Sequence, residues 1–226
     1  MMQKITDVIL NPDMFFAEKK QFAEEIKLPL IVVVVTGIIS AVTGYLMGEL
    51  TIRMFSGPGA GMGQIIIISG VVGAFFGVLL MWVIGCAILY LLSMAFKANG
   101  GFKKTLEFIG WGFIPQIFSG IIGLLVALYY LPLVQVPVLR SSQDPALIQS
   151  AMNQLMYDPS MFQFRQVSSI ISIIFIIWSA NIWIFGMKHA RGLTTRNAAI
   201  VVLVPVIIYI VSILYTIFSG IPTPGA

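Results

Sequence analysis

The chain contains very little charge, one cysteine and one histidine. Only 10% of its residues are charged and 58% are hydrophobic, so it cannot supply the polar surface of a water-soluble protein. The single cysteine, Cys86, excludes an intrachain disulfide, and neither it nor the lone His189 makes a zinc site. We therefore expect an integral membrane protein without a metal or other cofactor.

The sequence also lacks the motifs of common enzyme classes. It has no glycine-rich phosphate loop, no His-Glu-x-x-His, and no serine or cysteine close to a candidate base. Its net charge of +4 comes from basic residues in short runs beside apolar segments, a pattern typical of membrane topology signals. We therefore predict neither an enzyme nor a nucleic-acid partner.

Long apolar segments dominate the rest of the sequence and predict an all-α, polytopic membrane bundle. We expect a cytoplasmic amphipathic segment over 1–27, a membrane domain over 28–218 and a short tail over 219–226. A further short helix is predicted in the loop 132–165, between Asp144 and Asp158. The five predicted transmembrane helices cover 28–48, 64–96, 105–131, 166–187 and 197–218.

The N-terminal segment contains a helix start at Asn11, which is followed by Pro12. Helical spacing places Phe15, Phe22 and Ile26 on one face, opposite charged residues. This predicts a short amphipathic helix that lies on the membrane.

Basic residues indicate the orientation, because cytoplasmic loops of membrane proteins are enriched in Lys and Arg. Ten of the 13 basic residues lie on one predicted side, and Arg53, Arg140 and Arg165 lie on the other. We therefore predict a cell-membrane protein with a cytoplasmic N-terminus and an external C-terminus. The predicted cytoplasmic residues are Lys4, Lys19, Lys20 and Lys27, and the turn residues Lys97, Lys103, Lys104, Lys188, Arg191 and Arg196.

Two glycine pairs have the small-residue spacing that lets helix backbones approach closely. They are Gly44 with Gly48 and Gly73 with Gly77. The pairs predict helix packing, either between spans of one chain or in a homo-oligomer. Two prolines, Pro115 and Pro205, predict kinks within the third and fifth spans.

Three polar residues fall within predicted spans, where each must be hydrogen-bonded or face water. They are Glu107 and Gln116 in the third span and Asn181 in the fourth. One hypothesis is a polar intramembrane site between these spans. The alternative is that Glu107 pairs with Lys188 or Arg191, while the two amides satisfy backbone groups near kinks.

Three stretches of the sequence form a recognisable set: "ILNPDMFFAEKK", "ANGGFKKTLEFIGWGFIPQI" and "WIFGMKHARGLTTRNAAIVVLVP". Together they resemble the Yip domain family, five-span membrane proteins named for interaction with Ypt/Rab GTPases. The resemblance implies five spans, a cytoplasmic N-terminus and, in eukaryotic members, a role in vesicle traffic through a sizeable cytosolic N-terminal region. Here only 27 residues precede the first span, which speaks against GTPase binding of that kind and resembles the compact bacterial and archaeal members.

Two functions follow as hypotheses. The first is a non-enzymatic scaffold or adaptor in membrane organisation or trafficking, whose basic turns and N-terminal helix bind a protein or lipid surface. Its partners would be the lipid bilayer and a second copy or another membrane protein. The alternative is a small transporter or channel that uses Glu107, Gln116 and Asn181.

Overall fold

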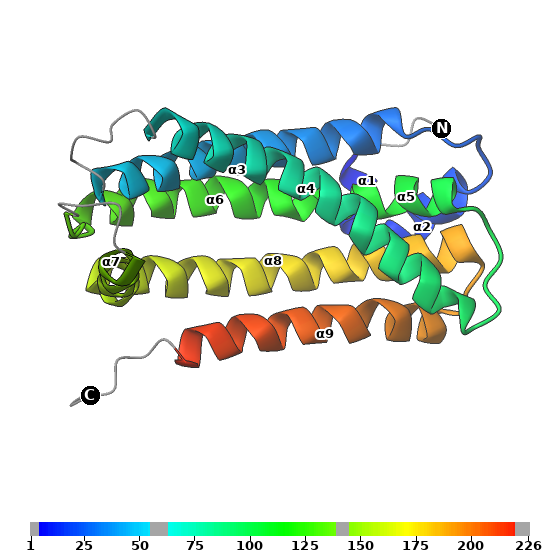
Figure 1. The fold of residues 1–226 in the computed structure, drawn as a ribbon. Coiled ribbons are helices and arrows are strands. Elements are labelled where there is room, and N and C mark those ends of the chain that lie inside the picture. The colour runs from blue at the N-terminus through cyan, green and yellow to red at the C-terminus, as the bar shows by residue number, and fades with distance from the viewer. Residues whose placement is uncertain (1–4, 55–62, 139–144, 220–226) are drawn as a thin grey trace.

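The computed structural model describes residues 5–54, 63–138 and 145–219, which fold almost entirely into helices (Figure 1). Five helical stretches are long and apolar enough to cross a membrane, which confirms the predicted all-α bundle. In chain order the helices are α1 (Ile5–Leu10), α2 (Pro12–Lys19), α3 (Lys27–Met54), α4 (Gly63–Met94), α5 (Phe102–Trp111), α6 (Ile114–Tyr130), α7 (Pro145–Tyr157), α8 (Pro159–Arg191) and α9 (Thr195–Ser219).

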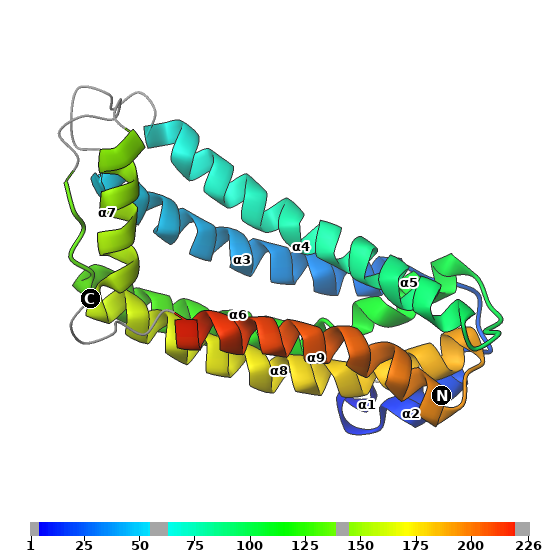
Figure 2. The ribbon, with the colours of Figure 1, turned by 60° about the horizontal axis from the view of Figure 1, so that its bottom comes forward.

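The long helices form an elongated bundle. Helix α3 packs against α4 and α6, and α8 packs between α6 and α9. Helix α4 crosses the others obliquely, while α7 lies across one end of the bundle (Figures 1 and 2). The short helices α1, α2 and α5 gather at the opposite end.

The outer faces of the long helices are apolar and open. Between 17% and 28% of the most apolar part of each candidate span is buried within the protein. Large aliphatic side chains such as Ile68, Leu80 and Ile208 point outward and are more than half exposed. Hydrocarbon is the environment that suits such faces, because every backbone group of a spanning helix is already satisfied internally.

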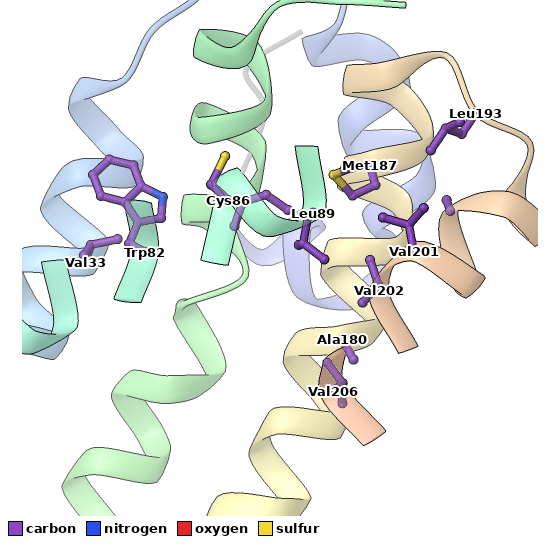
Figure 3. Packing of buried hydrophobic residues seen from close by; sticks show 12 residues of the cluster. Val33, Trp82, Cys86, Leu89, Ala180, Met187, Leu193, Val201, Val202 and Val206 are labelled. Atoms are coloured by element: carbon purple, nitrogen blue, oxygen red, sulfur yellow. The ribbon is translucent and has the colours of Figure 1, made fainter. Parts of the chain in front are cut away.

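Buried apolar residues form three clusters along the bundle. One joins α4, α8 and α9 near the end that carries α5, with Trp82, Cys86, Met187 and Val202 among its members (Figure 3). A second packs α7 and the start of α8 against the far ends of α3 and α6. The third attaches α1 and α2 to α5 and α8. Both ends of the bundle are therefore held by packing within the protein.

The first span is longer than predicted. Helix α3 continues past Gly48 to Met54, so residues 49–54 of the predicted loop are helical. Leu50 and Met54 are buried against α7 and the start of α8, and this packing extends the helix beyond the length that the bilayer needs. Residues 55–62 of the predicted loop lie outside the described part of the chain.

The third predicted span consists of two helices. Pro115 has no N–H to donate to the carbonyl of Trp111, and the chain turns at Gly112 and Phe113 before α6 begins. Pro115 therefore lies in the first turn of α6, and the interruption predicted at this residue takes the form of a break between two helices. Pro205 lies inside α9, which stays one continuous helix across it.

The fourth span also begins earlier than predicted. Asp158 caps α8, since its Oδ1 accepts hydrogen bonds from the backbone nitrogens of Ser160 at 2.9 Å and Met161 at 3.0 Å. The helix then runs unbroken to Arg191. The predicted loop 132–165 therefore ends at Asp158, and α7 is the short helix expected within it.

The N-terminal helix starts as predicted but is held differently. The Asn11 side chain accepts a hydrogen bond from the backbone nitrogen of Met14 at 3.4 Å, which confirms the cap. Helix α2 ends at Lys19, so Phe22 lies outside it and is 62% exposed. Phe15 and Phe16 instead pack on Trp111 and Phe108 of α5. The expectation of a helix resting on lipid is corrected accordingly, because the apolar face of α2 is buried against protein.

Candidate functional site

Most charged residues gather at one end of the bundle, which we call the cap. The cap comprises α1, α2, α5, the segment 20–27, the turn 95–101, the end of α8, the turn 192–194 and the start of α9 (Figure 1). Of the 13 basic residues, Lys4 and Arg140 lie outside the described part of the chain. Nine of the remaining 11 belong to the cap, and only Arg53 and Arg165 do not.

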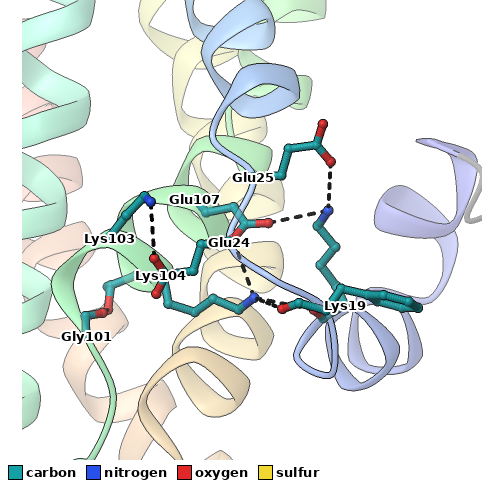
Figure 4. A network of polar contacts seen from close by, with 9 residues as sticks. Lys19, Glu24, Glu25, Gly101, Lys103, Lys104 and Glu107 are labelled. Atoms are coloured by element: carbon teal, nitrogen blue, oxygen red, sulfur yellow. Dashed lines mark hydrogen bonds and ion pairs between the residues drawn. The ribbon is translucent and has the colours of Figure 1, made fainter.

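A buried carboxylate, that of Glu107, lies at the centre of the cap (Figure 4). The side chain of Glu107 is fully buried, and its two oxygens lie 3.4 Å from Lys19 Nζ and 3.5 Å from Lys104 Nζ. Glu25 lies 3.7 Å from the same Lys19 amine, so two acids face two bases. A buried charge requires such compensation, because its desolvation costs several kcal/mol.

Lys104 ties the segment that follows α2 to α5. Its amine donates to the backbone carbonyls of Phe22 at 2.9 Å and Lys19 at 3.4 Å. It also lies 5.1 Å from the centre of the Phe108 ring. Lys103 beside it makes only a solvent-exposed pair with Glu24 at 3.6 Å, which contributes little. The neighbouring lysines thus differ in environment, since Lys104 is buried and Lys103 is exposed.

A second ionic contact fixes α2 to the end of α8. Asp13 accepts hydrogen bonds from Lys188 Nζ at 2.7 and 2.9 Å and lies 2.6 Å from the Nε2 of His189. The hydrogen bonds from Lys188, and then the contact with His189, lower the pKa of Asp13 below its usual value of 3.8. The N-terminal segment is therefore attached to both α5 and α8.

Arg191 joins the two turns of the cap. Its guanidinium donates to Ser93 Oγ at 2.9 Å, to the carbonyl of Gly100 and to the carbonyl of Ala98 at 3.4 Å, and it lies 4.0 Å from the centre of the Tyr90 ring. Arg191 is only 2% exposed. The planar guanidinium group can donate hydrogen bonds to several acceptors at once. Of the predicted cytoplasmic turn residues, Arg191 and Lys104 are therefore buried, whereas Lys97, Lys103 and Arg196 are exposed.

Two tryptophans complete the attachment of α5. Trp82 of α4 donates from Nε1 to the carbonyl of Leu106 at 3.1 Å, and Trp183 of α8 donates to the carbonyl of Ile109 at 2.9 Å. The second bond reaches a carbonyl beside the break between α5 and α6. A Cβ at Gly112 would overlap the Trp183 indole, so this close approach requires glycine.

The three predicted intramembrane polar residues do not come together. Glu107 lies in α5, outside the five candidate spans, and pairs with Lys19 and Lys104 rather than with the predicted Lys188 or Arg191. Gln116 donates to Ser179 Oγ at 2.9 Å, which links α6 to α8. Asn181 is exposed on another face of α8. This placement gives the transport hypothesis no shared site.

The two glycine pairs have different environments. A Cβ at Gly44 would lie 2.5 Å from the carbonyl oxygen of Gly70, and one at Gly48 would lie 3.1 Å from Ile67 Cα. This pair therefore supports close packing of α3 on α4 within one chain. A Cβ at Gly73 or Gly77 would meet nothing within 4 Å, so the predicted packing at these residues does not occur within the described part of the chain.

Several residues of the cap escaped the sequence analysis. The Lys104–Glu107 pair has the i, i+3 spacing of helix neighbours, a signal that could have revealed it in the sequence. The contacts of Lys19 with Glu107, Asp13 with Lys188 and Ser93 with Arg191 join segments far apart in the chain. No local pattern marks such partners.

Comparisons with known proteins find a family model that covers the membrane domain and a relative that covers part of the chain. The model of the Yip1 domain matches residues 6–216. An uncharacterized protein of Methanocaldococcus jannaschii is 30% identical over 128 residues, which are 57% of this chain and 91% of that protein. No solved structure matches the chain. The match includes α1, α2 and all five spans, so the cap lies within the family's shared region.

Proposed function

The chain belongs to the Yip1 domain family, and we propose that it is a non-enzymatic membrane scaffold whose cap binds a membrane-protein partner or a second copy. The observation that carries this proposal is the burial of Glu107 between Lys19 and Lys104. These ion pairs fix the N-terminal segment to the bundle, so the cap presents a preformed surface. A preformed surface loses little conformational freedom on binding.

The exposed part of the cap has the composition of a recognition surface. Lys20, Lys97, Lys103 and Arg196 are exposed, and the apolar side chain of Phe22 is exposed beside Lys20. Positive charge attracts a partner with an acidic face and speeds encounter, while an exposed aromatic ring supplies contact area. This surface suits an acidic cytoplasmic region of another membrane protein, or the acidic residues of a second copy.

The charge distribution also supports an orientation. Nine of the 11 described basic residues lie at the cap, and the positive-inside rule places such an end in the cytoplasm. With five spans the C-terminus then lies outside.

Photo-crosslinking in native membranes tests the scaffold. A photoreactive residue at position 97 or 196 of the cap should capture a protein, either a second copy or a partner that mass spectrometry identifies. The same group at Ile208, an exposed position on the apolar face of α9, provides the control. With the photoreactive group at position 97, the double variant Lys20→Glu, Arg196→Glu should lose the captured product. Recovery of lipid alone from all three positions would contradict the proposal.

A further inference from the structure

We propose that a groove between α3 and α4 binds an acyl chain of phosphatidylethanolamine, with the lipid's ammonium group held by Glu49 and Tyr45. This site lies on the flank of the bundle, away from the cap, and does not depend on the scaffold role. Its two parts are the apolar groove and an anionic group at one end of that groove.

The groove follows the seam between the two helices. It has a volume of ≈ 610 Å³, within the range of about 300–1,000 Å³ that is usual for small-molecule sites. Both helices contribute apolar walls, and the single polar group among the lining side chains is the Tyr45 hydroxyl. The lining residues are Ile38, Ala41, Val42, Tyr45, Val71, Val72, Phe75 and Phe76.

The carboxylate of Glu49 lies on α3 just beyond the residues that line the groove. The Tyr45 hydroxyl donates to Glu49 Oε1 at 2.7 Å, one helical turn beyond the groove. Within the described part of the chain, no ion pair compensates the charge of Glu49. A carboxylate beside lipid-facing side chains favours a cation that supplies this compensation.

The position of Glu49 along the bundle matches the depth of a lipid headgroup. Helix α3 begins at Lys27 in the cap, and Glu49 lies about 33 Å further along its axis at 1.5 Å per residue. The hydrocarbon core of a bilayer is about 30 Å thick, so Glu49 lies at the boundary opposite the cap. The groove extends from this boundary toward the bilayer centre, as an acyl chain does.

The polar groups select among phospholipids. A primary ammonium donates hydrogen bonds to a carboxylate, whereas the methylated ammonium of phosphatidylcholine has no N–H to donate. Phosphatidylglycerol carries no cation and would be repelled by Glu49. Arg53, exposed one turn beyond Glu49, can donate hydrogen bonds to the oxygens of the lipid phosphate. Phosphatidylethanolamine is therefore the lipid that the site fits best.

Native mass spectrometry and thermal unfolding of the purified, delipidated full chain test this proposal. Phosphatidylethanolamine should bind more tightly than phosphatidylcholine or phosphatidylglycerol and raise the unfolding temperature more. Glu49→Gln should weaken its binding about tenfold, since a charge-assisted hydrogen bond is lost. The control Glu18→Gln removes an acid from α2 in the cap and should leave the preference unchanged.

A second variant tests the groove itself. Val72→Trp places a bulky ring in the groove and should reduce retention of phosphatidylethanolamine. Leu80→Trp adds the same ring to an exposed position on α4 outside the lining and should not. Equal binding of the three lipids to the wild type would overturn the proposal, as would an unchanged preference in Glu49→Gln or unchanged retention in Val72→Trp.

Discussion

Glu107 in α5 and Lys19 at the end of α2 form an ion pair of 3.4 Å in which the carboxylate is completely buried. The pair joins the N-terminal segment to the middle of the chain. Because Lys104 compensates the other oxygen of Glu107, one acid holds two elements of the cap together. The stability of the cap should therefore depend on this carboxylate more than on any exposed charge.

Substitution of Glu107 by Gln should destabilise the protein by about 3–5 kcal/mol. The change leaves the amines of Lys19 and Lys104 buried without their shared acid, which is the costly way to break a buried pair. Thermal unfolding in detergent would measure the loss, and faster proteolysis within residues 5–26 would locate it. Glu18→Gln removes an acid for which no ion pair is found in the described part of the chain and should change little. Similar unfolding temperatures for the two variants would refute a central role of Glu107.

Arg191→Lys should lower the unfolding temperature by several degrees, although it preserves the positive charge. A lysine amine cannot reach Ser93 and the carbonyls of Ala98 and Gly100 together, as the guanidinium does. Arg196→Lys changes an exposed arginine close in sequence and serves as the matched control. Circular dichroism during heating gives the comparison. If both variants melt like the wild type, charge alone and not fork geometry matters at Arg191.

The contribution of Asp13 should depend on pH. Its pKa is lowered in the folded protein, so its contacts with Lys188 and His189 stabilise the fold above the ordinary pKa of 3.8. That contribution is lost as pH falls from about 4 toward the lowered pKa, where Asp13 becomes protonated. The difference in unfolding temperature between wild type and Asp13→Asn should therefore be largest at pH 5 and decrease toward pH 3. A gap that widens on acidification would show that the sign is wrong.

Gly44→Ala and Gly73→Ala have the same glycine spacing but opposite expected effects. The added methyl at Gly44 meets the Gly70 carbonyl at 2.5 Å, which should cost about 1–3 kcal/mol through overpacking. At Gly73 the methyl meets nothing within 4 Å, and alanine is the better helix former, so stability should stay or rise slightly. Unfolding temperatures of the two purified variants give the test. Equal destabilisation would mean that Gly73 packs against something outside the single chain, such as a second copy.

The sequence predicted local features of the fold well where one segment carried the whole signal. Hydropathy along each long segment gave five spans, and Asn11 with Pro12 gave the start of α2. Pro115 predicted an interruption of the third span, but a proline specifies only a lost hydrogen bond, so the sequence did not show that the interruption is a break between two helices. Here Trp183 supplies a donor beside the break, and two helices replace one kinked span.

The candidate site was predictable only in part. Glu107 was identified as unusual, since an acid beside an apolar run needs a partner, yet the partners proposed for it were wrong. Lys19 reaches Glu107 because the segment after α2 folds back along α5 and is fixed there by Lys104. The course of this segment is set by the assembled bundle, so it could not be read from the sequence.

The amino-acid sequence by itself determined that this protein meets lipid with five helices and concentrates positive charge at one end. Both properties depend on the hydropathy and charge of many residues together, so no single residue decides them. Only the tertiary structure decided which lysines are buried, which glycine pair is packed and where α5 separates from α6. These outcomes depend on how each helix is rotated about its axis against its neighbours, and a rotation is set by contacts between distant residues.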